Sequence, residues 1–263
     1  PLRSPDTARE NLDSTRAVLA MNENLDWNVG RILEHLAKLG VADDTIVVYF
    51  SDNGANTARW NAGMKGRKTS VDEGGVRSSF FIRWPGRIQA GATIGEIAGA
   101  IDLHPTLAQL AGVKRVGALP LDGVDLSPLL SGEKAAWPER MIFSHWAGRF
   151  GVRTARHRLD DRGALFDLAA DPGQQTDLIG AQPAVAAQLR AAVAGWTKEM
   201  FGNAPPVPAR PGGGARPVVV DPRAIPVGHP VHATTFLPAG EGLPGGGVQR
   251  SNRFPNCTYF TQW

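Results

Sequence analysis

The feature that most constrains the fold is the run Thr-Ile-Val-Val-Tyr-Phe at positions 45–50, which stops abruptly at Ser-Asp-Asn-Gly. Strands of parallel sheets are covered on both faces and therefore lose the alternation of polar and apolar residues. The run predicts such a buried central strand. Asp52 and Asn53 follow it directly, so they are expected at its carboxyl end.

Asp52 and Asn53 are candidate ligands of a metal ion. Open α/β sheets bind their ligands beyond the carboxyl ends of the strands, and both side chains offer the hard oxygen donors that Ca²⁺ or Mg²⁺ prefers. The same residues are also ordinary turn formers, because Asp caps its own backbone and Asn and Gly tolerate positive φ. The residues alone leave the metal site and the plain turn both open.

A helix before this strand completes one αβ unit. Apolar residues recur in steps of three and four from Val18 to Leu39, which predicts an amphipathic helix that ends at Gly40. A second strand is predicted at 76–84, where Pro85 follows. These elements indicate a doubly wound α/β sheet.

The segment between the two strands is basic and has little periodicity. Lys65, Arg67 and Lys68 fall within four positions, next to the possible metal site, where they could clamp an oxyanion. A solvated basic loop is the alternative interpretation. The Glu-Gly-Gly at 73–75 indicates that the backbone approaches another part of the molecule closely.

The later part of the chain predicts a short helix that opens near Asp102, followed by strands at 141–146, 151–159 and 164–168. The last two strands are separated by a turn and form a hairpin. A further amphipathic helix follows around 185–196.

The predicted fold class is therefore α/β: a partial doubly wound, mainly parallel sheet flanked by helices, followed by a small antiparallel sheet with a packing helix. We expect three regions, with the α/β part at 1–135, the small sheet and helix at 136–201, and a tail at 202–263. Gly and Pro make up 21 residues of this tail, which cannot build a core of its own.

Charge and cysteine content exclude several classes of protein. The net charge is +3, but Lys and Arg are scattered and never form a run of five, so no nucleic-acid partner is predicted. No apolar stretch of about 18 residues is present, which predicts no membrane span. The single Cys257 excludes an internal disulfide and a site with several cysteines.

Several short motifs, in their order and spacing, resemble the formylglycine-dependent sulfatases, which belong to the alkaline phosphatase-like superfamily. They are Ser-Asp-Asn-Gly at 51–54, Lys68 with Glu-Gly-Gly-Val-Arg at 73–77, Trp-Pro-Gly at 84–86, Asp-Leu-His-Pro-Thr at 102–106, Leu-Asp-Gly-Val at 121–124, and Phe-Asp-Leu-Ala-Ala-Asp-Pro at 166–172. The likeness extends from about residue 13 to residue 196.

The resemblance implies a role for each candidate residue. Asp52 and Asn53 would supply two ligands of a Ca²⁺ or Mg²⁺ ion, and Lys68, five residues before Glu-Gly-Gly, would contact the sulfate group in place of Lys65. Lys68 is thus both the catalytic and the substrate-binding candidate. The implied reaction is attack on sulfur by a hydrated formylglycine, with a small-molecule or glycan sulfate ester as substrate. The family also implies a periplasmic or secreted protein.

One departure from the family pattern concerns the nucleophile. The Cys/Ser-x-Pro-x-Arg motif is absent, since Cys257 is followed by Thr-Tyr-Phe and Ser4 by Pro-Asp-Thr. The family places this motif and the other metal ligands ahead of Pro1, so we expect an incomplete or inactive fragment. Two alternatives stay open: a phosphatase or phosphodiesterase-type hydrolase of the same superfamily, and a non-catalytic binding remnant.

Overall fold

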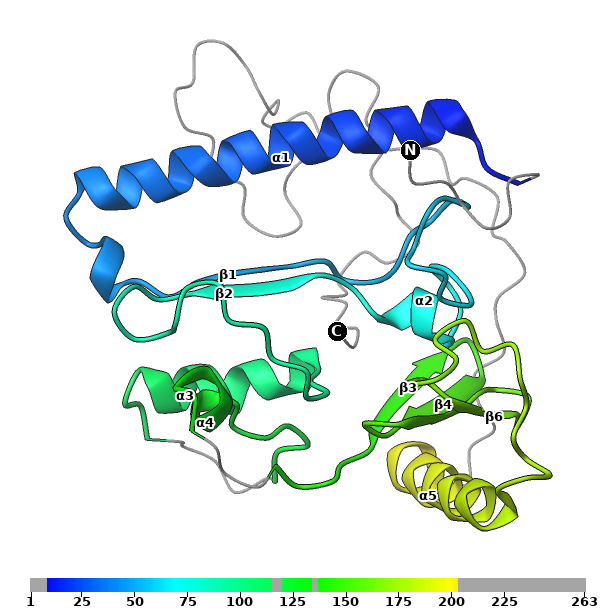
Figure 1. Cartoon of the computed structure of the whole chain (residues 1–263). Helices are drawn as coiled ribbons and strands as arrows, with labels where there is room; N and C mark the ends of the chain where they lie inside the picture. Colours follow the sequence, from blue (N-terminus) through cyan, green and yellow to red (C-terminus); the bar gives the residue numbers. More distant parts are fainter. Residues whose placement is uncertain (1–8, 115–119, 134–136, 203–263) are drawn as a thin grey trace, which may run out of the picture. The chain divides into compact units, whose positions relative to one another are not determined.

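The computed structural model describes residues 9–114, 120–133 and 137–202 (Figure 1). All of them lie in one of the two compact units of the chain, Pro1–Val207 with Phe260–Trp263. The other unit, Pro208–Tyr259, lies outside the described residues, and so does the predicted tail apart from Gly202. The region boundaries at 135 and 201 stay predictions.

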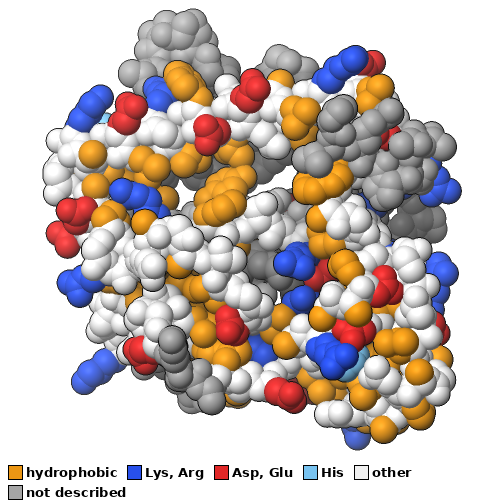
Figure 2. All heavy atoms as spheres, viewed as in Figure 1, with side chains coloured by type: hydrophobic (Ala, Val, Ile, Leu, Met, Phe, Trp, Pro, Cys, Tyr) orange, Lys and Arg blue, Asp and Glu red, His pale blue; other side chains and the backbone are white. Residues whose placement is uncertain are grey.

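The predicted first helix is confirmed as α1, Leu12–Lys38. Asn11 caps it, because its side-chain oxygen accepts a hydrogen bond from the Ser14 N–H at 2.9 Å. The helix buries none of its residues. Met21 and Trp27 are 68% and 60% exposed, and hydrophobic side chains are visible on the surface of α1 in Figure 2. The predicted amphipathic helix therefore has no fully covered apolar face among the described residues.

The predicted buried strand is β1, Val47–Phe50, which follows the short 3₁₀ helix Ala42–Asp44. It pairs with β2, Phe80–Arg83, and the two strands run antiparallel. The mainly parallel sheet is not confirmed, since β2 is the only partner of β1 among the described residues. All four residues of β1 are half-buried, so the buried central position predicted for this strand is not confirmed either. An apolar run predicts a strand that can be covered on both faces, but it does not reveal the direction of its neighbour.

Short helices connect these strands to the rest of the chain. Their bounds are α2 Glu73–Val76, the 3₁₀ helix Ala100–Asp102, α3 Leu103–Leu110 and α4 Ser127–Leu130. The Glu-Gly-Gly motif thus begins a helical turn. No helix among the described residues combines the length and the apolar character needed to cross a membrane.

Asp102 is fully buried before α3 and joins three parts of the chain. Its carboxylate accepts hydrogen bonds from the N–H groups of Gly99 and Val124, both at 2.8 Å. Arg140 donates to both carboxylate oxygens at 2.8 Å. Asp102 thus has a structural role, although its side chain does not cap α3.

The predicted small antiparallel sheet is confirmed. Its strands lie in the order β3-β4-β5-β6, with bounds Ile142–Trp146, Arg149–Arg153, His157–Leu159 and Leu165–Asp167. The stretch predicted as one strand at 151–159 is broken, because the Thr154 hydroxyl accepts hydrogen bonds from the N–H groups of Arg156 and His157. The predicted hairpin is the pair β5 and β6.

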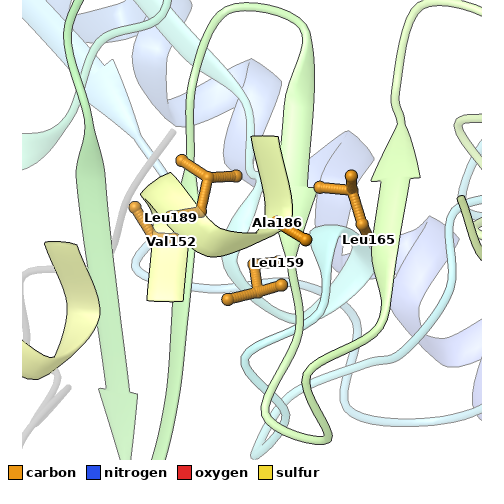
Figure 3. Close-up of a cluster of buried hydrophobic side chains, with 5 residues drawn as sticks. All are labelled: Val152, Leu159, Leu165, Ala186 and Leu189. Carbon is orange, nitrogen blue, oxygen red and sulfur yellow. The ribbon is translucent and has the colours of Figure 1, made fainter. Parts of the chain in front are cut away.

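The predicted packing helix is α5, Pro183–Phe201, which contacts β4 and β5. The core between helix and sheet, drawn in Figure 3, consists of Val152, Leu159, Leu165, Ala186 and Leu189. Burial of these side chains is the main stabilising force here. We call residues 142–201, which comprise β3–β6 and α5, the C-terminal sheet unit.

Candidate functional site

The end of β1 and the basic segment after it lie against each other. The Lys68 N–H donates a hydrogen bond to the Ala55 carbonyl at 2.9 Å, and the Gly54 N–H donates to the Gly75 carbonyl at 3.0 Å. We call residues 51–55 the strand tip and residues 65–75, which include the first three residues of α2, the Lys68 loop. These backbone contacts bring together the two segments that carry the candidate site residues Asp52, Asn53 and Lys68.

Glycines make this close approach possible. A Cβ atom at Gly54 would overlap the backbone of Gly74, and one at Gly75 would lie 2.5 Å from the Ser70 carbonyl oxygen. Neither backbone group can move aside as a flexible side chain could. The close approach that Glu-Gly-Gly indicated is thus confirmed, and it involves the strand tip and the Lys68 loop.

Asn53 and Lys68 line one cavity of about 870 Å³. Arg59 and Arg77 line it as well, so three cationic side chains surround the same space, against one carboxylate, that of Asp26. Asp52 is exposed and is not among the described residues that line this cavity. Sequence reasoning missed Arg59, which lies in an aperiodic segment and belongs to no motif. Such a cavity favours an anion.

Lys65 and Lys68 differ in their surroundings. The Lys65 Nζ lies 3.0 Å from Asp160 Oδ2 and 3.4 Å from Asp72 Oδ1. Burial by itself lowers the pKa of Lys65, but the hydrogen bond to Asp160 and the charge of Asp72 together raise it above its ordinary value. Lys68 is exposed, and it has no ion pair among the described residues. This difference supports Lys68, and not Lys65, as the residue available to a substrate.

Asp52 and Asn53 offer the oxygen donors that a hard cation prefers, but two residues are too few to complete its coordination shell. Within the described part of the chain, no group of three or more His, Cys, Asp or Glu side chains could hold a metal ion. Calcium takes about six to eight oxygen ligands, and these two residues supply only a few of them. The Ser51 hydroxyl donates to the Asn53 carbonyl at 3.2 Å, so the turn interpretation also has a contact in its favour. The metal-ligand roles stay predictions.

Two family models match overlapping parts of the chain. The model described as Sulfatase matches residues 2–113, which hold the strand tip and the Lys68 loop. The model described as N-sulphoglucosamine sulphohydrolase, C-terminal, matches residues 67–197, which hold most of that loop and most of the C-terminal sheet unit.

Curated relatives are sulfatases as well. Human arylsulfatase A is 33% identical over 193 residues, which cover 59% of this chain and 38% of that protein. Mouse steryl-sulfatase is 35% identical over 133 residues, which cover 47% of this chain and 21% of that protein. The chain therefore spans well under half the length of these relatives.

A solved structure, that of Ps i-CgsB, is 26% identical with a TM-score of 0.60; the match covers 70% of this chain and 42% of that one. A phosphonate monoester hydrolase from Silicibacter pomeroyi, at 24% identity and a TM-score of 0.50 over 68% of this chain and 39% of that one, shows a shared fold alone. The two family models, the two curated relatives and the ordered motifs agree. The chain belongs to the sulfatase family.

Proposed function

We propose that the protein carrying this chain hydrolyses a sulfate monoester, with Lys68 binding the sulfate group. The observation that carries the proposal is the pair of backbone hydrogen bonds between the strand tip and the Lys68 loop. These bonds join the segment that carries Lys68 to the segment that carries Asp52 and Asn53. In addition, Asn53 and Lys68 line the same cavity.

In this proposal the chain's own residues bind and neutralise the anion. The Lys68 ammonium would contact sulfate oxygens and stabilise the charge that develops as the ester bond breaks. Asp52 and Asn53 would contribute to the binding of Ca²⁺ or Mg²⁺. A bound divalent cation would polarise the sulfate oxygens as a Lewis acid. The formylglycine nucleophile is part of the proposal too, and the motif that would produce it is not in this sequence.

The proposed substrate class is a sulfate ester of a small molecule or of a glycan. Arylsulfatase A and steryl-sulfatase are named for small-molecule esters, while Ps i-CgsB has also been solved in complex with a k-i-k-neocarrahexaose. The cationic cavity suits an anionic ester of either kind but does not choose between them. A phosphate ester is less well supported, because the phosphonate hydrolase shares only the fold with this chain.

The test is hydrolysis of an aryl sulfate and of the matching aryl phosphate by the full-length protein. Lys68→Ala should lower kcat by about 10²–10³-fold or more, because it removes a cation aimed at the reacting group. Arg67→Ala is the matched control, since Arg67 is an exposed neighbouring cation that does not line the cavity. Preference for the phosphate ester, or an unchanged rate in the Lys68 variant, would overturn the proposal. No hydrolysis of either ester would favour a non-catalytic binding protein.

A further inference from the structure

Besides the strand tip, the C-terminal sheet unit also holds the Lys68 loop. Its first residue, Lys65, is paired with Asp160 of the turn after β5. Near its middle, the Thr69 carbonyl accepts a hydrogen bond from the Arg149 guanidinium of β4. The loop is therefore fixed on both sides of Lys68 by residues far away in the sequence.

The far end of the loop is fixed most firmly. Arg158 of β5 is fully buried, and its Nη1 donates to the Val71 carbonyl at 2.6 Å. Its Nε donates to Glu73 Oε2 at 3.2 Å. The Glu73 N–H in turn donates to the side-chain oxygen of Gln174 at 3.0 Å. Side chain and backbone at this end of the loop are both bound to the C-terminal sheet unit.

Glu73 also offsets a repulsion between two positive charges in the sheet. Arg153 and Arg158 lie directly opposite each other in the register of β4 and β5, where two like charges repel. The Glu73 carboxylate is 1% exposed and lies 3.3 Å from Arg153 Nε and 3.1 Å from Arg158 Nη2. Burial lowers the pKa of both guanidinium groups, and the charge of Glu73 opposes this change. The loop's carboxylate thus offsets the repulsion between two arginines of the sheet.

Lys68 itself is exposed and has no ion pair of its own in the described part of the chain. Its position is therefore set through the backbone, by the hydrogen bond to Ala55 of the strand tip and by its neighbours in the loop. We infer that the C-terminal sheet unit positions Lys68, with Arg158 as the main positioning residue and Arg149 as a second one. This inference rests on the proposed function, because it names the residues that set the geometry of the same site.

A double-mutant cycle on aryl sulfate hydrolysis by the full-length protein tests the inference. The four proteins are the wild type, Lys68→Ala, Arg158→Lys and the double variant. Arg158→Lys keeps a cation beside Glu73 but loses the planar fork that also reaches Val71. We expect kcat to fall about 10²-fold with little change in KM, since a displacement of about 1 Å at the reacting group has that effect. In the Lys68→Ala background the same change should have no further effect.

Arg156→Lys is the matched control, because Arg156 pairs with Asp167 within the C-terminal sheet unit and does not touch the loop. It should leave kcat unchanged. If Arg158→Lys does not fold, Arg149→Ala replaces it, since Arg149 is exposed and its side chain binds Thr69 and Asp161 among the residues that the structure describes. It should give a smaller loss that also vanishes in the Lys68→Ala background.

Equal losses in both backgrounds would show that these arginines act on the fold alone, and would overturn the inference. So would a wild-type rate in both arginine variants. If Lys68→Ala itself changes nothing, the proposed role of Lys68 fails instead, so failure of the proposed function can be told apart from failure of the inference.

Discussion

Gly54 is the residue at which the strand tip and the Lys68 loop come closest. Its N–H donates to the Gly75 carbonyl, and a side chain there would overlap the backbone of Gly74. The obstacle is a helical turn, α2, that also carries Glu73. Even a methyl group at this position must therefore displace an element that the C-terminal sheet unit holds in place.

We predict that Gly54→Ala destabilises the fold by about 1–3 kcal/mol, the usual effect of overpacking. Gly195→Ala is the opposite control. Gly195 lies within α5, and an added Cβ would meet nothing within 4 Å. It should raise stability by roughly 0.5–1 kcal/mol, because alanine is the better helix former. Urea unfolding of the two variants measures both changes. A Gly54→Ala variant as stable as the wild type would show that the two segments can separate freely.

At the scale of elements, the hairpin of β5 and β6 depends on carboxylates at its turns. Asp160 Oδ1 accepts hydrogen bonds from the N–H groups of Arg162 and Ala164, both at 2.9 Å. Asp167 at the end of β6 pairs with Arg156 and accepts from the Ala169 N–H at 3.0 Å. The same hairpin carries Arg158.

The Asp167 carboxylate should make this unit sensitive to acid. The hydrogen bond from Arg156, and then those from the N–H groups of Ala169 and Ala170, hold the pKa of Asp167 below its ordinary value of 3.8. A carboxyl group with a lowered folded pKa contributes stability that is complete above 3.8 and is lost as the pH falls through the folded value.

Asp167→Asn should therefore lower stability at neutral pH, and its deficit relative to the wild type should shrink as the pH falls below 3.8. Urea midpoints of both proteins across this range provide the measurement. A deficit that stays constant from neutral to acid pH would contradict the assigned cause.

Sequence patterns predicted the elements better than the contacts between them. Steps of three and four residues located α1, and the apolar run located β1, because both patterns are local. The motif spacing singled out Lys68. The pairing of Glu73 with Arg158 joins residues 85 positions apart and leaves no local pattern. The antiparallel partner of β1 was missed for the same reason, since periodicity does not encode which strand lies alongside.

At the scale of the whole molecule, the chain carries candidate residues for only part of the proposed sulfatase site. It spans 38% of the length of human arylsulfatase A. Its described residues include Lys68, the proposed anion-binding residue, and two candidate oxygen donors, Asp52 and Asn53, of which Asp52 is exposed. A cation bound through so few ligands is held weakly, and weak binding adds little stability to a fold.

We predict that millimolar Ca²⁺ does not raise the Tm of the chain comprising residues 1–263. At a calcium concentration tenfold below Kd, the stabilisation is only about 0.06 kcal/mol. Thermal unfolding with calcium, with magnesium and with a chelator is the measurement. A clear rise in Tm with calcium that disappears in Asp52→Asn would mean that these residues form a more complete site than their number suggests.

The buried pairing of Glu73 with Arg153 and Arg158 limits how sulfatases can be recombined. A chimera that takes residues 142–201 from another family member, but keeps its own Lys68 loop, exchanges one half of a buried set of charges and retains the other. Unless the donor also has arginines at both positions, a carboxylate is left inside the protein without its counter-charges. Residues 65–75 should therefore be transplanted together with the distant sheet, although the two segments are separated in the gene.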